Sequence, residues 1–209
     1  MKKILTSVLA ASLMLLGTSA FAQVSVGAGY VNSKNAYTTS SGSTSDAEPM
    51  NGFYVGVDYN VPIGDIFGMS AGVNYEFLTS KDYELGSFLK GKYTEQYINV
   101  PVRLNAGFGL ADGVRLFVFG GPTFSYGLSA QSEGNVSVAG IDLGGKYDNY
   151  QKAGWNRFDV MVGGGAGLDL MDKIRLTVGY DLGMFNRLPK DSSDKLNRNK
   201  LHAGIAFLF

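Results

Sequence analysis

Apolar and polar residues alternate along most of the chain after residue 22, and one alternating stretch occurs twice. The first copy is AGFGLADGVRLFV at 106–118, and the second is AGLDLMDKIRLTV at 166–178. Strict alternation gives a β-strand one apolar face and one polar or small face. Each copy therefore predicts two strands, and the short turn between them forces the strands to pair in antiparallel fashion.

The register of these hairpins places charged residues on one face of the sheet. If Leu170 pairs with Ile174, then Asp169 faces Arg175 on the other side of the sheet. Arg115 takes the corresponding position in the first copy. The charges therefore share a face with small residues, and that face must be wet or internally paired.

Eight alternating segments account for most of the chain. They are expected at 24–30, 53–61, 67–79, about 93–110, 114–128, 156–170, 174–188 and 198–209. The connections alternate between long loops and short turns, and the turns fall at 62–66, 111–113 and 171–173. This pattern predicts an all-β fold: an eight-stranded antiparallel up-and-down transmembrane β-barrel with both termini in the periplasm. The segment 131–155 is partly alternating, so its base is expected to extend the sheet outward.

The first 22 residues have the three parts of a secretory signal peptide. Lys2 and Lys3 form a basic end, residues 4–16 form an apolar core, and residues 20–22 (Ala-Phe-Ala) form a small-x-small cleavage site. The mature chain is therefore expected to span 23–209 as one outer-membrane β-barrel domain.

The composition agrees with a barrel in the outer membrane of a Gram-negative bacterium. The chain has 29 glycines, 13 Phe and 12 Tyr, a single Trp and no cysteine that could form a disulfide. Removing the two signal-peptide lysines leaves 16 basic residues (18 − 2) beside 18 acidic ones. This net charge of −2 (16 − 18) argues against a nucleic-acid partner.

A soluble lipocalin-like barrel would show the same alternation with its faces reversed. Lysine positions separate the two folds, because a water-facing outer wall would carry lysines in mid-strand. The lysines of the mature chain instead fall in expected loops, turns or strand ends: Lys34, Lys81, Lys90, Lys92, Lys146, Lys152, Lys173, Lys190, Lys195 and Lys200. Aromatic residues also gather near the strand ends, as membrane-interface anchors do. They are Tyr30, Phe53, Phe77, Tyr97, Tyr126 and Phe158 toward the loops, and Phe67, Phe108, Phe207 and Phe209 toward the turns. The membrane barrel is therefore preferred.

Two stretches resemble known outer-membrane barrels. The ending LHAGIAFLF alternates to a terminal Phe209, and it resembles the C-terminal signal by which the barrel-insertion machinery recognises its substrates. The stretch YINVPVRL, 97–104, resembles a strand with a mid-strand proline in the OmpA-like and PorT-type outer-membrane β-barrels of Bacteroidota. The resemblance implies a small barrel embedded in outer-membrane lipid. PorT-type members imply a role beside a secretion machine.

The inward face of the expected barrel carries the candidate functional charges. Arg115, Asp169 and Arg175 are expected to meet at the turn end, with Asp58 as a second acid across the lumen. The other inward charges are Arg103, Glu76, Asp159 and Asp181. Because eight strands leave room only for side chains, this network is expected to plug the lumen.

His202 is the only histidine in the sequence. Its neighbours Leu201 and Ala203 take the lipid face, so His202 is expected to pack in the lumen rather than to act as a general base. We expect no catalytic residue, no cofactor and no metal site, although calcium binding in the polar loops stays open.

Pro101 and Pro122 are expected to lie nearly opposite each other on neighbouring strands. Each lacks an N–H group, so the hydrogen-bond ladder should be broken there. The break is either a bulge that shapes the barrel or a weak seam for lateral docking.

These observations favour a non-enzymatic outer-membrane barrel, a structural or surface-interaction protein that acts through its outer loops. Tyr147, Tyr150 and Trp155 are expected to be exposed and to anchor a contact with an extracellular or envelope protein. The alternatives are a small-solute transport protein, an outer-membrane lipid-modifying enzyme and an accessory barrel of a secretion machine.

Overall fold

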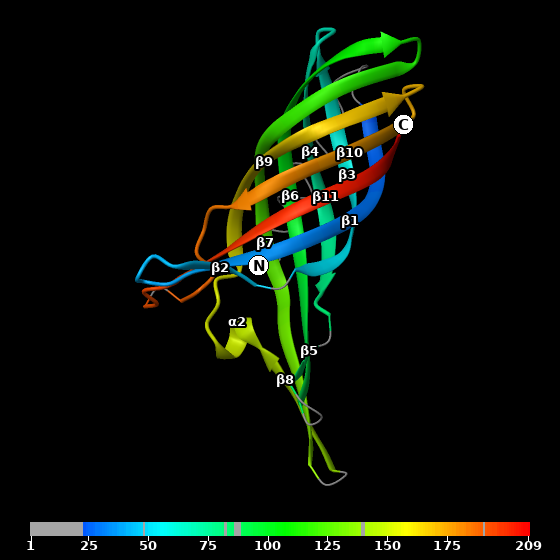
Figure 1. Ribbon diagram of the computed structural model, residues 1–209. Helices are drawn as coiled ribbons and strands as arrows, with labels where there is room; N and C mark the ends of the chain where they lie inside the picture. The colour runs from blue at the N-terminus through cyan, green and yellow to red at the C-terminus, as the bar shows by residue number, and fades with distance from the viewer. Residues whose placement is uncertain (1–22, 48, 82, 86–88, 139–140, 190) are drawn as a thin grey trace, which may run out of the picture.

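The computed structural model describes residues 23–47, 49–81, 83–85, 89–138, 141–189 and 191–209. These residues form an all-β antiparallel barrel (Figure 1). The eight strands of the ring are β1 (Gln23–Thr38), β3 (Met50–Ile63), β4 (Phe67–Thr79), β6 (Leu89–Ala111), β7 (Val114–Val138), β9 (Phe158–Leu170), β10 (Ile174–Gly183) and β11 (Lys195–Leu208). The elements outside the ring are β2 (Thr44–Asp46), β5 (Tyr83–Leu85), β8 (Ile141–Asp148) and the short helix α2 (Asn149–Lys152). The signal peptide expected at 1–22 lies outside the described residues and stays a prediction.

The ring closes between its first and last strands. β1 pairs with β11 in antiparallel fashion, with Val26 opposite Phe207, and the other ring strands pair with their neighbours in sequence. The second hairpin has the expected register, because Ile174 lies opposite Leu170. The predicted eight-stranded up-and-down fold is therefore confirmed.

A four-stranded extension projects from the loop end of the ring (Figure 1). It forms because β6 and β7 continue past the ring and pair with β5 and β8. We call this extension the blade; it comprises β5, residues 89–96 of β6, residues 129–138 of β7, and β8. The expectation that segment 131–155 extends the sheet is confirmed, and the helix α2 follows the blade in the chain.

The two faces of the ring differ as the alternation predicts. The outer wall is apolar, and Tyr30, Phe53 and Val57 are each 49% exposed. The inner wall is mostly small or polar, and the charged side chains in its middle are buried; Glu76 and Arg198 are each 1% exposed. Among the described residues, no helix is long and apolar enough to cross a membrane. An apolar outside around a polar inside is the arrangement of an outer-membrane barrel.

Two positions differ from the expectation. Tyr97, which was expected in the outer aromatic belt, faces the lumen and is 3% exposed. Lys200, which was expected at a strand end, also faces the lumen, where it is 5% exposed and pairs with Glu76. Tyr97 lies an even number of residues from the inward-facing Arg103 on β6, so it points inward too. Lys200 lies in mid-strand because β11 begins at Lys195, three residues before the expected start at 198.

Glycines on β9 let the wall lie close to aromatic rings inside the lumen. A Cβ atom at Gly165 would stand 2.0 Å from the carbonyl oxygen of Val178 and 2.8 Å from the ring of Phe119. A Cβ atom at Gly167 would stand 2.4 Å from the ring of Phe117. Packed atoms do not approach so closely, so neither position has room for a side chain.

Candidate functional site

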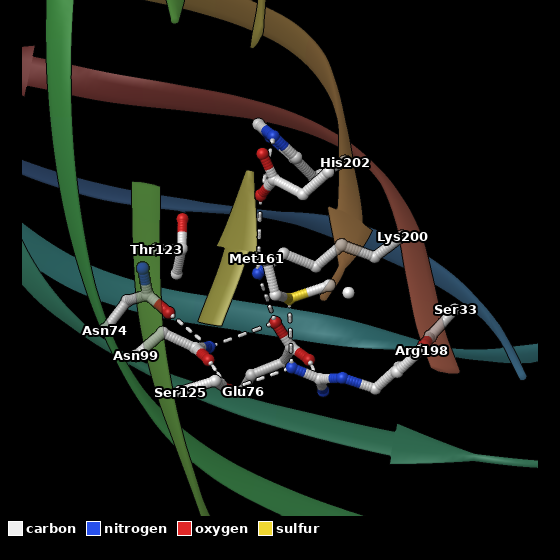
Figure 2. Close-up of polar contacts among 12 residues, drawn as sticks. Ser33, Asn74, Glu76, Asn99, Thr123, Ser125, Met161, Arg198, Lys200 and His202 are labelled. Carbon is white, nitrogen blue, oxygen red and sulfur yellow. Dashed lines mark hydrogen bonds and ion pairs between the residues drawn. The ribbon is translucent and has the colours of Figure 1, made fainter. Parts of the chain in front are cut away.

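In the middle of the lumen, several hydrogen-bond donors surround the carboxylate of Glu76 on β4. Its carboxylate accepts hydrogen bonds from Arg198 Nη1 at 2.8 Å and from Lys200 Nζ at 3.1 Å, both on β11. Asn99 on β6 donates a third hydrogen bond at 3.1 Å. Figure 2 shows Glu76 among these side chains. Arg198 also lies over the ring of Tyr97, with Cζ 3.7 Å from the ring centroid. Donors from two strands therefore hold this buried carboxylate in its charged form.

A second ion pair lies beside the first. Arg103 Nη2 on β6 donates to both carboxylate oxygens of Asp181 on β10, at 2.7 and 2.9 Å. Arg103 also donates to the hydroxyl of Thr123 at 2.7 Å and to the carbonyl oxygen of Gly121. Lys200 Nζ lies 3.8 Å from Asp181 and so links the two carboxylates. We call this cluster the central network; it comprises Glu76, Arg103, Asp181, Arg198 and Lys200.

The cluster expected at the turn end is present. Arg175 donates from Nε and Nη2 to the two oxygens of Asp169, at 2.7 and 3.0 Å, and Arg115 Nη1 reaches the same carboxylate at 3.4 Å. The second partner of Arg175 is not Asp58, as expected, but the carboxamide oxygen of Asn60, which accepts from Nη1 at 2.6 Å. Asn60 shares the inward face of β3 with Asp58 and lies two residues nearer to the turn, which brings it to the level of Arg175.

Side chains from three segments close the loop end of the lumen. Arg187, in the loop after β10, pairs with Glu95 on β6 at 2.8 Å. The same guanidinium donates to the hydroxyl of Tyr97 at 2.8 Å. The ring of Trp155 packs on it, with the ring centroid 4.8 Å from Cζ. The mouth of the barrel is therefore filled by an ion pair between two aromatic side chains.

Of the three aromatic residues that were expected to be exposed, only Tyr147 is open to solvent, at 40%. Tyr150 is 7% exposed, and the guanidinium carbon of Arg157 lies 4.5 Å from its ring centroid. Trp155 packs on Arg187 instead of facing outward. The expectation is therefore wrong for Tyr150 and Trp155, because the segment that carries them folds against the barrel mouth.

Acidic and cationic side chains are equal in number in the lumen over the described residues. Six cationic side chains take part in its ion pairs, namely Arg103, Arg115, Arg175, Arg187, Arg198 and Lys200, and so do four acidic ones, namely Glu76, Glu95, Asp169 and Asp181. Asp58 and Asp159 also lie in the lumen, and the described residues show no ion pair between them and an arginine or lysine. The lumen thus holds six acidic side chains (4 + 2) beside six cationic ones. A buried charge without compensation is strongly penalised, so this balance is what a narrow lumen requires.

A cavity of about 130 Å³ lies between the central network and the turn end. Asp58, Asn74 and His202 are among the residues that line it. His202 faces the lumen as expected, with Nε2 3.8 Å from Asp181 Oδ2 and its ring edge-on to Tyr54 at 6.5 Å. Its Nε2 atom has no hydrogen-bond partner among the described residues. The space beside it has both polar and apolar side chains in its lining and is large enough to hold water.

The ladder between β6 and β7 is interrupted at Pro122 and directly after Pro101, which still lies opposite Thr123. Residues 102–103 of β6 and 121–122 of β7 have no partner in this ladder. The strands still touch there, because a Cβ atom at Gly121 would lie 2.2 Å from the carbonyl oxygen of Val102. The register is the same on both sides of the gap, with two residues skipped on each strand, so the expected bulge is not present there. The close contact also argues against an open seam.

An exposed polar contact ties two loops together outside the ring. The hydroxyl of Tyr37 donates to the carboxylate of Asp194, and the backbone N–H of Ser40 donates to it at 2.9 Å. These hydrogen bonds, that of Tyr37 above all, lower the pKa of Asp194 below its ordinary value. The same contact raises the pKa of the Tyr37 hydroxyl.

Four charged members of the lumen were not found from the sequence, namely Glu95, Arg187, Arg198 and Lys200. A signal for three of them was present. Arg198 and Lys200 on β11 lie an even number of residues from His202, so they are on the same inward face of the strand. Glu95 lies an even number of residues from Arg103 on β6 in the same way. Arg187 lies in a loop, where no alternation could place it.

A family model and several solved structures resemble the chain. The model of the family described as "Outer membrane protein beta-barrel domain" matches residues 19–188. Ail, the attachment invasion locus protein of Yersinia pestis, is 12% identical with a TM-score of 0.46, over 90% of this chain and 99% of that one. Neisserial surface protein A is 16% identical with a TM-score of 0.43, over 89% and 97%. The outer membrane enzyme PagL is 10% identical with a TM-score of 0.41, over 83% and 97%. No curated protein matches the chain in sequence.

We predict that Glu76→Gln strongly destabilises the barrel. The change leaves Arg198 without its counter-charge and Lys200 with only the more distant Asp181, 3.8 Å away. Breaking a buried ion pair costs about 3–5 kcal/mol. Urea unfolding of the protein in lipid vesicles measures the loss. The matched control is Glu133→Gln, which breaks a pair with Lys146 whose side chains are 37% and 71% exposed. The control should cost less than about 1 kcal/mol. Equally small losses for both variants would show that the central network is solvated.

Proposed function

Because the chain belongs to the outer membrane protein beta-barrel domain family, we propose that it is a structural or surface-interaction protein of the outer membrane that catalyses no reaction. The observation that carries the proposal is the filled lumen. Ion-paired side chains occupy its turn end, its middle and its loop end among the described residues. A small barrel filled in this way leaves its outer loops as the surface for function.

The proposal includes an orientation, with both termini in the periplasm and the blade outside the cell. The two ends of the mature chain lie together, because the backbone N–H of Phe209 donates to the carbonyl oxygen of Val24 at 2.8 Å. The three short turns join strands of the ring, whereas β2, the blade and α2 lie in the longer connections. Short periplasmic turns and longer outer loops are the rule in such barrels, and this supports the orientation.

The proposed partners follow from this placement. The strand that ends at Phe209 would be recognised by the barrel-insertion machinery, and the apolar outer wall would contact outer-membrane lipid. Tyr147 is the exposed aromatic residue on the blade, and it is the candidate anchor for an extracellular or envelope partner.

The alternatives have less support. Solute transport needs a continuous path through the lumen. The ion-paired side chains at its turn end, middle and loop end argue against such a path. A lipid-modifying enzyme needs a base that reaches lipid, whereas His202 packs inside the ring against Tyr54. An accessory role beside a secretion machine rests on the resemblance of residues 97–104 to PorT-type barrels of Bacteroidota, and it is one form that the surface interaction could take.

The orientation predicts which single cysteines are labelled on intact cells. The chain has no cysteine of its own, so each variant carries one thiol. Ser43→Cys and Gln151→Cys lie at exposed positions of the loop end and should react with a membrane-impermeant maleimide. Asp112→Cys, in a turn, should react only after the outer membrane is opened. The reverse pattern would invert the orientation.

The filled lumen predicts that the protein conducts no steady current. In planar-bilayer recordings the refolded wild type should show no large single-channel steps. Asp169→Ala removes the turn-end ion pairs but leaves the central network and the pair of Arg187 with Glu95, so this variant should also stay closed. A porin refolded in the same way is the positive control. Large, steady steps from the wild type would reject the plugged lumen and favour solute transport.

The surface-interaction role predicts that the blade is needed for adhesion but not for folding. Gln131 lies opposite Asp148, so residues 132–147 can be replaced by a two-residue turn without disturbing the ring. Cells that carry this variant should lose adhesion to a second cell layer while keeping normal amounts of barrel in the membrane. Replacing the exposed residues 40–43 is the matched control. Unchanged adhesion after both replacements would leave only the structural role.

A further inference from the structure

The apolar outer wall of the ring differs in height between its two sides. On β1 the outward-facing positions are apolar only over residues 24–30, and on β11 over 201–209, which are runs of seven and nine residues. On β7 the outward-facing positions carry no polar side chain over the fifteen residues 114–128. The corresponding runs on its neighbours β6 and β9 cover thirteen residues each, 98–110 and 158–170. We call the outward residues of 24–30 and 201–209 the short wall; β1 and β7 lie on opposite sides of the ring.

These two heights lie on either side of the usual membrane thickness. At a rise of about 3.4 Å per residue and a tilt of about 45°, the run on β1 covers about 17 Å along the membrane normal and the run on β7 covers about 36 Å. The apolar band of an outer-membrane barrel is about 25 Å tall. Tilting the whole barrel moves both rims of one side together, so a tilt cannot remove the difference. The bilayer must therefore be thinner beside β1 than beside β7.

Polar side chains fix the loop-end rim of the short wall. Asn32 follows Tyr30 on the outward face of β1, and its Nδ2 donates to the carboxamide oxygen of Asn51 on β3 at 2.8 Å. The hydroxyl of Tyr30 donates to the same oxygen. Lys34, the next outward residue on β1, is exposed. Because carboxamide and ammonium groups are costly to place in hydrocarbon, the hydrocarbon of the bilayer must stop near Tyr30.

The short wall is also hollowed along β1. An apolar groove of about 670 Å³ lies there, and all the residues that line it are apolar or glycine. Ala28 lies between Val55 on β3 and Ile205 on β11, with which it pairs, so a small side chain separates two larger ones. A flexible acyl chain can follow such a groove. Lys34, beyond its loop end, matches the phosphate of a lipid headgroup, whereas a second copy seated here would bring two lysines together.

We propose that the barrel thins the outer membrane beside the short wall and gathers lipids with short acyl chains there. A lipid whose chains match the height of the wall leaves no apolar side chain in water and no polar side chain in hydrocarbon. The cost of a mismatch rises with each ångström, so lipids with longer chains are favoured beside β7 instead. This role belongs to the membrane-spanning wall and does not depend on the blade.

Fluorescence quenching by brominated lipids shows which lipid touches each side of the barrel. Val26→Cys on β1 and Val118→Cys on β7 each place a single thiol on the outer wall, where the native side chains are 49% and 59% exposed. The mature protein is labelled with bimane and refolded into vesicles of short-chain dimyristoleoyl- and long-chain dierucoyl-phosphatidylcholine, of which only one is brominated. The brominated short-chain lipid should quench the label at 26 roughly twofold more than the label at 118, and the brominated long-chain lipid should reverse this order.

Lengthening the short wall should remove the preference. Asn32→Leu together with Lys34→Leu extends the apolar run on β1 to the eleven residues 24–34, and both side chains face outward. Because eleven residues span an ordinary bilayer, the label at 26 should then show no preference for the short-chain lipid. Gln96→Leu, at the loop-end rim of the wall on β6, is the matched control and should leave quenching at 26 unchanged.

Three results would overturn the proposal. Equal quenching at both positions by both lipids would show that the two sides meet a bilayer of the same thickness. A preference that persists after Asn32→Leu and Lys34→Leu would show that the height of the wall does not set it. A label at 26 that neither lipid quenches would show that a second copy, and not lipid, covers the short wall. The proposed surface role of the blade would stand in each case, because adhesion does not depend on the wall.

Discussion

The architecture depends on holding charged side chains in a lumen that admits little water. Eight strands enclose a space that side chains alone can fill, and an unpaired charge in it would be strongly penalised. Glu76 meets this constraint by accepting hydrogen bonds from Arg198, Lys200 and Asn99 together. The bond from Arg198 to Glu76 crosses the lumen and joins β11 with β4, and the bond from Arg103 to Asp181 joins β6 with β10. Neither pair of strands is adjacent in the ring. The network therefore braces the ring as well as closing it.

The same packing constraint gives glycine two different roles. In the ring, Gly165 has no room for a Cβ atom because Phe119 and the next strand already fill the space. On the blade, Gly134 and Gly145 face open space, and nothing in the packing of the sheet requires them. A glycine inside a strand weakens the strand, since it adds backbone entropy and no contact.

Local alternation was enough to predict the fold and one cluster of the lumen. Asp169 and Arg175 sit on one hairpin, so a single turn fixes their register. Contacts across the lumen were harder to predict. Alternation along a strand tells which face a residue is on, but not its position along the barrel axis. Asp58 and Asn60 share a face, and only the stagger between distant strands decides that Asn60 reaches Arg175. The exposure expected for Tyr150 was wrong because this residue lies in a segment without regular alternation, and that segment folds against the barrel mouth.

The helix α2 joins the closed lumen to the open surface. Tyr150 is buried at the mouth of the barrel, and Lys152, two residues later, lies over Tyr147 on the blade. Asn149 at the start of α2 also donates a hydrogen bond to Ser132 on β7 at 3.1 Å. The filled lumen gives this short helix a rigid base, which a one-turn helix could not provide for itself. The buried charges therefore affect the outer surface only indirectly. They keep the barrel mouth rigid, and α2 with its Lys152 packs against that mouth.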